Sequence, residues 1–153
     1  MIKNLLALFL LISSVASVCA TPVVLWQSDS PEGVSVSWGA AGPTISAEQC
    51  ADFTGGGKIE VSVVSCNSGA ILLLTKGDWN GDLCPAVYPD NLTMPATVTF
   101  SLTPAQAKSA RELGFIPFGT GYNISRISYV PSETEVDPDA IWFGSEDCRS
   151  EWK

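Results

Sequence analysis

Alternating apolar and polar residues run through the middle of the chain and predict β-strands. Residues 58–63 and 96–102 alternate strictly, which places the apolar side chains of each stretch on one face of an extended strand. Residues 70–75 form a continuous apolar run, as in a strand that is covered on both faces. Further strand-like stretches bounded by turn residues are 23–26, 34–38, 44–46, 115–118 and 123–130.

Helical signals are few and brief. Ser46 stands three residues before Gln49, a capping-box pattern, and glycines at 55–57 end this stretch. A second helix is predicted from Thr103 to Gly114, with Pro104 at its first position. Seven or eight strands with one or two short helical connections predict an all-β fold, a β-sandwich of which the jelly roll is the commonest eight-stranded form.

The first twenty residues predict a secretory signal peptide. A short start containing Lys3 precedes an apolar run from Leu5 to Ile12, and Val18-Cys19-Ala20 offers small or short residues for cleavage after Ala20. The run is too short to span a bilayer. Val18 stands where a lipoprotein signal needs Gly, Ala or Ser, which disfavours lipidation of Cys19. The mature chain is therefore expected to be secreted and extracellular, with no membrane segment.

Composition removes several classes of function. The chain has 153 residues, with 16 acidic residues, 8 basic residues and no histidine. Without histidine there is no Ser/His/Asp or Cys/His catalytic arrangement and no His-bound metal. A net charge of -8 argues against nucleic acid as a partner, because such binding needs Lys and Arg to neutralise phosphates.

Four cysteines remain after the signal is removed, which predicts disulfides in an oxidising compartment. The candidates are Cys50, Cys66, Cys84 and Cys148. A Cys66–Cys84 bridge between neighbouring strands is one possibility among three connectivities. Zinc is disfavoured because no two of these cysteines form a C-x-x-C pair.

The region after residue 130 differs in composition from the rest. Residues 131–139 contain two prolines and four acids, as a linker does. Residues 140–153 then repeat the residue pattern of the first predicted strands, with Ile141-Trp142 matching Leu25-Trp26. We interpret 21–130 as one domain and 140–153 as the incomplete start of a second, similar module; the alternative is an acidic tail whose tryptophans match by chance.

Three short motifs give the chain a resemblance to a known family. They are Leu25-Trp26, the Lys-Gly-Asp-Trp turn at 76–79, and the Gly-x-Gly-Tyr-Asn strand at 119–123. With these, residues 22–130 resemble the β-sandwich carbohydrate-binding modules attached to secreted bacterial glycoside hydrolases and esterases, often in tandem. The resemblance implies a non-catalytic domain that binds a polysaccharide or oligosaccharide, with any activity in a linked or downstream catalytic domain. Four mature cysteines and the lack of a catalytic domain here depart from the family's pattern.

The residues themselves also allow sugar binding. A sugar ring presents an apolar face and a rim of hydroxyls, so a site needs an exposed aromatic ring beside short polar side chains. We expect Trp79, Tyr122 and Tyr88 as platforms, with Asp78, Asn80 and Asn123 bonding hydroxyls. The acidic composition favours a neutral, plant-type glycan, bound in the micromolar to millimolar range.

Each of these residues has an alternative role. Trp79 is equally a lid over the sandwich edge, Tyr122 a packing residue at a strand entry, and Trp26 and Trp38 are core candidates. Asp78, Asn80 and Asp82 have the spacing of a calcium loop, but its glycine and closing glutamate are missing, so no cofactor is predicted.

Two other functions are weighed against glycan binding. One is a secreted β-sandwich that binds protein, as an adhesin, inhibitor or scaffold piece. The other is a small hydrolase that uses Asp78 and Asp82, although nothing in the sequence pairs these carboxylates across a cleft.

Overall fold

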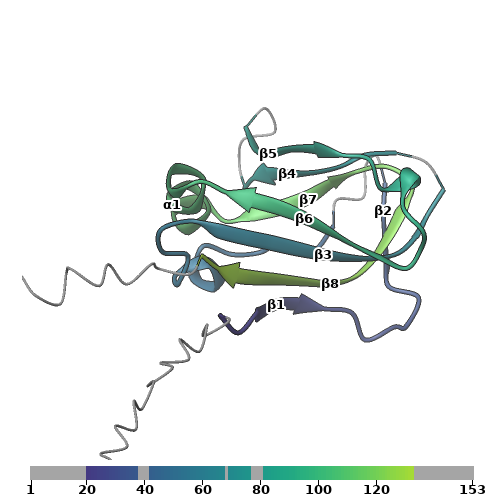
Figure 1. Ribbon diagram of the computed structural model, residues 1–153, viewed down its shortest axis with the longest axis horizontal. Coiled ribbons are helices and arrows are strands. Elements are labelled where there is room, and N and C mark those ends of the chain that lie inside the picture. The colour runs from purple at the N-terminus through teal and green to yellow at the C-terminus, as the bar shows by residue number, and fades with distance from the viewer. Residues whose placement is uncertain (1–19, 38–41, 68, 77–80, 133–153) are drawn as a thin grey trace, which may run out of the picture.

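Two antiparallel sheets face each other in the computed structural model, which describes residues 20–37, 42–67, 69–76 and 81–132 (Figure 1). The larger sheet has the order β1 (Val23–Gln27), β8 (Tyr122–Pro131), β3 (Gly57–Cys66) and β6 (Ala96–Leu102), and β2 (Val34–Val36) pairs with the first residues of β8. The smaller sheet has the order β5 (Asp82–Val87), β4 (Ile71–Thr75) and β7 (Phe115–Gly119). The predicted all-β sandwich is confirmed.

The core lies between the two sheets and follows the alternating pattern. Ile59, Val61 and Val63 of β3 are buried with at most 1% exposure, while the residues between them reach the surface. β6 buries Val98, Phe100 and Leu102 in the same way. Strand β4 is buried almost throughout, as its continuous apolar run predicts. The period of two residues therefore decides which face of each strand turns inward.

Strand β5 is the element that the sequence pattern missed. Its segment reads Asp-Leu-Cys-Pro-Ala-Val, and Pro85 breaks the appearance of a strand. Proline has no N–H to donate to a sheet ladder, so in sheets it occurs mainly on edge strands. β5 is an edge strand, paired only with β4 in its sheet. The predicted strand at 44–46 is reduced to a single bridge between Ile45 and Phe115.

One α-helix joins the two sheets where the sequence predicted it. Helix α1 (Pro104–Leu113) begins at Thr103, whose hydroxyl accepts a hydrogen bond from the Gln106 N–H in a complete capping box. It ends at Gly114, which has φ of 72° and lies so close to Ile45 that a Cβ would meet the carbonyl oxygen at 2.3 Å. The predicted helix at 46–53 is a single 3-10 turn, η1 (Glu48–Cys50).

The sandwich has two distinct ends. The helix end carries α1, η1 and the connection from β4 to β5 at 76–81; Thr75 pairs with Phe115 there. The turn end carries a second 3-10 turn, η2 (Pro89–Asn91), and the connection between β7 and β8 at 120–121; Ile71 pairs with Gly119 there. Connections at the same end can share a surface, whereas the length of the strands separates the two ends.

Several predicted features lie outside the described residues. They are the signal peptide as far as residue 19, the linker after Ser132 and the start of a second module at 140–153. Strand β1 begins at Val23, so the predicted cleavage after Ala20 leaves every strand intact. Within the described part of the chain, no helix has the length and apolar character needed to cross a membrane.

Candidate functional site

The connection that was predicted to bind sugar leaves and rejoins the sandwich at the helix end. Thr75 closes its base, because both its N–H and its hydroxyl donate to the Gly81 carbonyl at 3.0 and 3.1 Å. The N–H of Lys76 donates to the Gly114 carbonyl just beyond α1, at 3.1 Å. Asp78, Trp79 and Asn80 lie outside the described residues, and with them two of the three residues of the calcium spacing. The base of this connection is thus fixed against the end of α1.

A hollow of about 370 Å³ lies between this base and helix α1. We call it the helix-side hollow and define it by Thr75, Gly81, Asp82, Gln106, Ser109 and Leu113; Leu83 and Ala105 complete its lining. Its polar groups are an exposed carboxylate on Asp82, the hydroxyl of Ser109 and the amide of Gln106. Leu113 adds an apolar surface, with 46% of the residue exposed. A hydroxyl-rich ligand would therefore find acceptors, donors and an apolar contact here.

Gln106 holds the floor of the helix-side hollow in place. Its side-chain N–H donates to the Leu83 carbonyl at 2.6 Å, while its side-chain oxygen accepts from the Thr103 N–H at 2.8 Å. The same residue therefore caps α1 and ties the helix to β5. The cap can be recognised in the sequence, but the contact with Leu83 cannot, because nothing local in the sequence places β5 beside α1.

The other residues of the predicted site lie at the opposite, turn end. Tyr88 precedes η2 and is 61% exposed. Tyr122 begins β8 and is only 1% exposed, so its ring presents no face to a ligand. The side chain of Asn123 donates to the Glu32 carbonyl at 3.2 Å. These three residues therefore lie at the other end of the sandwich from the base of the 76–81 connection. Because Asp78, Trp79 and Asn80 lie outside the described residues, the predicted site as a whole stays a prediction.

Burial of Tyr122 also changes its chemistry. Its hydroxyl is buried and has no hydrogen-bond partner among the described residues. Desolvation by burial, with a smaller contribution from Cys66, raises the pKa of Tyr122 well above its ordinary value of 10.0. Its burial agrees with the alternative role given for Tyr122 from the sequence, a residue that packs at a strand entry.

No disulfide joins any two of the cysteines in the described residues, Cys50, Cys66 and Cys84. The proposed Cys66–Cys84 bridge is not made, since Cys66 ends β3 in the larger sheet and the buried Cys84 belongs to β5 in the smaller one. The Cys84 thiol instead lies 4.0 Å from the Ser101 carbonyl oxygen of β6. Burial raises the pKa of Cys50 to about 12 and that of Cys84 to about 11. Cys148 lies outside the described residues.

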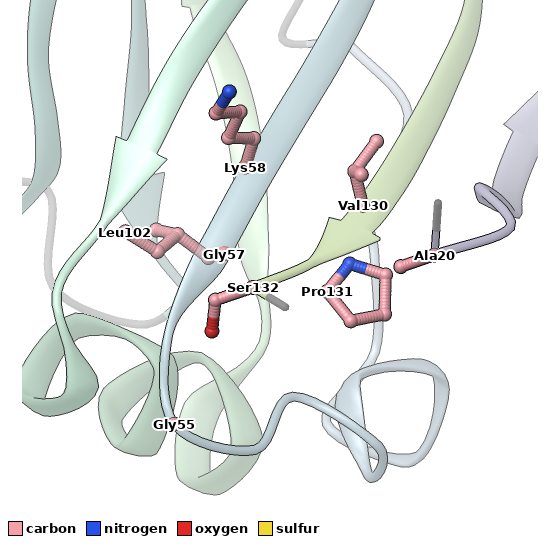
Figure 2. A pocket seen from close by; sticks show the side chains of 8 residues that line it. All are labelled: Ala20, Gly55, Gly57, Lys58, Leu102, Val130, Pro131 and Ser132. Atoms are coloured by element: carbon pink, nitrogen blue, oxygen red, sulfur yellow. The ribbon is translucent and has the colours of Figure 1, made fainter. Parts of the chain in front are cut away.

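A larger hollow of about 580 Å³ opens at the helix end of the five-stranded sheet, beside the start of β3 and the end of β8. Figure 2 shows Lys58 of β3 and Val130 and Pro131 of β8 around it, with Ala20 and Ser132 at its rim. Its lining is mostly glycine and apolar side chains, and Lys58 is its charged group. Predicted signal cleavage would remove Ala20 from this rim. For that reason the helix-side hollow is the better candidate.

Comparisons with solved structures show a likeness of fold. No protein-family model matches the chain, and no curated protein matches it significantly. Among solved structures it is similar to SGBP-B of the mixed-linkage glucan utilization locus of Bacteroides ovatus, determined in complex with a mixed-linkage heptasaccharide. The TM-score is 0.56 at 21% sequence identity, over 72% of this chain and 29% of that one. The likeness shows a shared fold, and this chain spans less than a third of the neighbour's length.

Proposed function

We propose that this protein is a secreted, non-catalytic domain that binds a neutral polysaccharide at the helix-side hollow. The observation that carries the proposal is the hollow itself, in which a carboxylate, a hydroxyl and an exposed leucine face the base of the connection that contains Trp79. Short polar side chains bond sugar hydroxyls, and an aromatic ring covers the apolar face of a sugar.

The proposed roles follow from that arrangement. Asp82 accepts hydrogen bonds from sugar hydroxyls, Ser109 donates or accepts, and Leu113 contacts the apolar ring face. Trp79 is the aromatic platform, and Asp78 and Asn80 beside it add polar contacts. Tyr88, Tyr122 and Asn123 are not part of this site, because they lie at the turn end. The likeness of fold to a protein determined with a heptasaccharide supports the class of ligand without identifying the glycan.

Affinity electrophoresis in gels that contain mixed-linkage β-glucan, xylan or mannan tests the proposal. We expect the wild-type chain to be retarded by at least one of them. Trp79→Ala should weaken binding roughly tenfold, the scale of one lost aromatic contact. Asp82→Asn should weaken it less, since the amide retains one acceptor oxygen. Tyr88→Ala is the matched control, because it removes an exposed aromatic residue at the other end of the sandwich. Unchanged retardation of both Trp79→Ala and Asp82→Asn would contradict the proposed site.

Protein binding is the second candidate function, and one observation favours it. Strand β1 lies at an edge of the larger sheet and exposes Val23 and Val24 by 45% and 47%. An exposed apolar edge strand can pair with a strand of another chain. If this function is correct, Val24→Lys should abolish capture of a partner from culture supernatant. The same change should leave retardation in glycan gels unaltered.

A further inference from the structure

The outward face of the larger sheet carries a row of four polar residues. Ladder pairing aligns Gln27 of β1, Arg126 of β8, Ser62 of β3 and Thr97 of β6. Ile127, Val61 and Val98, which neighbour three of them along the strands, are buried in the core, so the row points away from it. With neighbouring strands about 4.8 Å apart, the row spans roughly 14 Å.

Two hollows lie along this row, and Ser62 and Ser125 line both of them. The first, of about 470 Å³, lies between the loop after β1 and the residues Ser62, Ser125 and Arg126. The second, of about 240 Å³, continues past Ser62 and Ser125 to Thr97. We call the combined surface the outer-face groove and define it by Gln27, Asp29, Ser62, Thr97, Ser125 and Arg126.

The backbone shapes this groove before any ligand is bound. Ser125 is the extra residue of a β-bulge, because Ser62 pairs with Arg126 and the next residue of β3, Val63, pairs with Ile124. Bulges bend a strand and redirect its side chains, often beside binding sites. The Ser28 N–H donates to the Ser125 carbonyl at 2.8 Å, which ties the loop after β1 to the bulge. The wall and the floor of the groove are therefore fixed to each other.

Arg126 is the residue of this groove whose Nε has no hydrogen-bond partner among the described residues. The ion pair that the described residues form is Lys108–Glu112 on α1, so Arg126 has no carboxylate partner among them. Its Nε is buried and without a hydrogen-bond partner there. A guanidinium is charged at any physiological pH, and leaving its donors unpaired in a protein is unfavourable. An acceptor from outside the domain would correct this.

The chemistry of the groove selects a class of ligand. An anion would meet the Asp29 carboxylate at the rim and Glu60, which is two residues from Ser62 along β3. A peptide strand that adds to a sheet would pair along a free edge, at β1 or β6, whereas the centre of the groove crosses the interior strands β8 and β3. An apolar ligand would find hydroxyls, an amide and a guanidinium. What remains is an uncharged, hydroxyl-rich chain, to which Arg126 and Gln27 donate while Asp29 accepts.

We infer that the outer-face groove is a second glycan-binding site, which holds a segment of a neutral oligosaccharide across the four strands with Arg126 as its principal donor. The inference rests on the proposed function, since it assigns the same class of ligand. The site is separate from the helix-side hollow, which is built from α1, β4 and β5 and shares no residue with the groove. Two sites on one small domain would let it bind two segments of a polysaccharide, which raises its avidity.

Amide chemical shifts of the full ¹⁵N-labelled chain, titrated with a mixed-linkage glucan heptasaccharide, test this inference. We expect two groups of shifting amides, one around Ser62, Ser125 and Arg126 and one around Gly81 and Asp82. Arg126→Gln should weaken binding at the first group roughly tenfold, as expected for the loss of one charged donor, and should leave the second group unchanged. Trp79→Ala should do the opposite. Gln27→Ala, an exposed edge substitution, repeats the test if Arg126→Gln unfolds.

The other possible results show which of the two proposed sites, if either, is wrong. Shifts confined to Gly81 and Asp82, with no effect of Arg126→Gln or Gln27→Ala, would overturn the second site while supporting the first. Shifts confined to the groove would support the second site and contradict the first. No shift with the heptasaccharide, xylan or mannan oligosaccharides would contradict both. Groove shifts with a polyuronate oligosaccharide alone would overturn the assignment of a neutral ligand.

Discussion

The two ends of strand β8 each bury a tyrosine, and the surroundings of the two hydroxyls differ. At the helix end, Tyr129 stacks on Phe53 with ring centroids 3.9 Å apart, and its hydroxyl donates to the Gly56 carbonyl. At the turn end, the Tyr122 hydroxyl is equally enclosed but has no partner in the described part of the chain. An unpaired buried polar group costs about 1–3 kcal/mol. The buried tyrosine at the helix end therefore contributes more to stability than the one at the turn end. The proposed site lies at the helix end.

The largest expected effect comes from removing the stack at the helix end. Phe53→Ala leaves a cavity under Tyr129 and also removes the contact with Phe115, whose ring centroid is 6.4 Å away. We expect a loss of about 3–5 kcal/mol in the free energy of unfolding, measured by urea denaturation. Leu92→Ala, an exposed change at the turn end, should cost less than about 0.5 kcal/mol. Similar losses in the free energy of unfolding for the two variants would mean that the two ends contribute equally to stability.

Alkaline pH should weaken the fold through the buried groups of the core. The folded-state pKa of Tyr122 is raised above 10.0, and those of Cys50 and Cys84 are raised from 9.0 to about 12 and about 11. A raised folded pKa stabilises the native state below the unfolded value, and this contribution is lost as pH rises towards the folded value. The free energy of unfolding should therefore fall from about pH 9 upward. A flat or rising profile between pH 8 and 11 would contradict these burial effects; Tyr122→Phe should make the decline shallower.

Removing each tyrosine hydroxyl should give opposite results, and these are the smallest effects. Tyr129→Phe removes a satisfied hydrogen bond and leaves the Gly56 carbonyl unpaired, so we expect a loss of about 1–2 kcal/mol. Tyr122→Phe removes an unpaired hydroxyl and should be neutral or slightly stabilising. Paired thermal and urea unfolding of the two variants measures the difference. Equal losses would show that the Tyr122 hydroxyl also has a partner in solution.

Local sequence patterns were sufficient to predict most of this fold. Alternation identified β3 and β6, and the cap at Thr103 with the glycine at 114 identified α1. β5 could not be predicted, because a short segment that contains Pro85 has the composition of a loop. Only its pairing with β4 shows that it is a strand. The 46–53 stretch kept its reciprocal Ser46–Gln49 hydrogen bonds but closed only one 3-10 turn.

The candidate site was harder to predict, because it depends on which connections share an end of the sandwich. The sequence predicts Tyr88 and Tyr122 to be exposed aromatic residues near turns. In the structure both lie at the turn end, and Tyr122 is buried. Ser109 and Leu113 reach the helix-side hollow only because α1 packs beside β5. The row from Gln27 to Thr97 crosses four strands far apart in sequence, so only their pairing shows it.

Calorimetric titration of the full chain with a mixed-linkage glucan heptasaccharide tests the central claim most directly. Binding of an uncharged glycan through hydrogen bonds and aromatic contact predicts saturable heat with Kd between roughly 1 μM and 1 mM. Because the ligand is uncharged, Kd should change little between about 0.05 and 0.5 M salt. Trp79→Ala should reduce the heat of binding, and Tyr88→Ala should not. An absence of saturable heat with this and with xylan and mannan oligosaccharides would contradict the account.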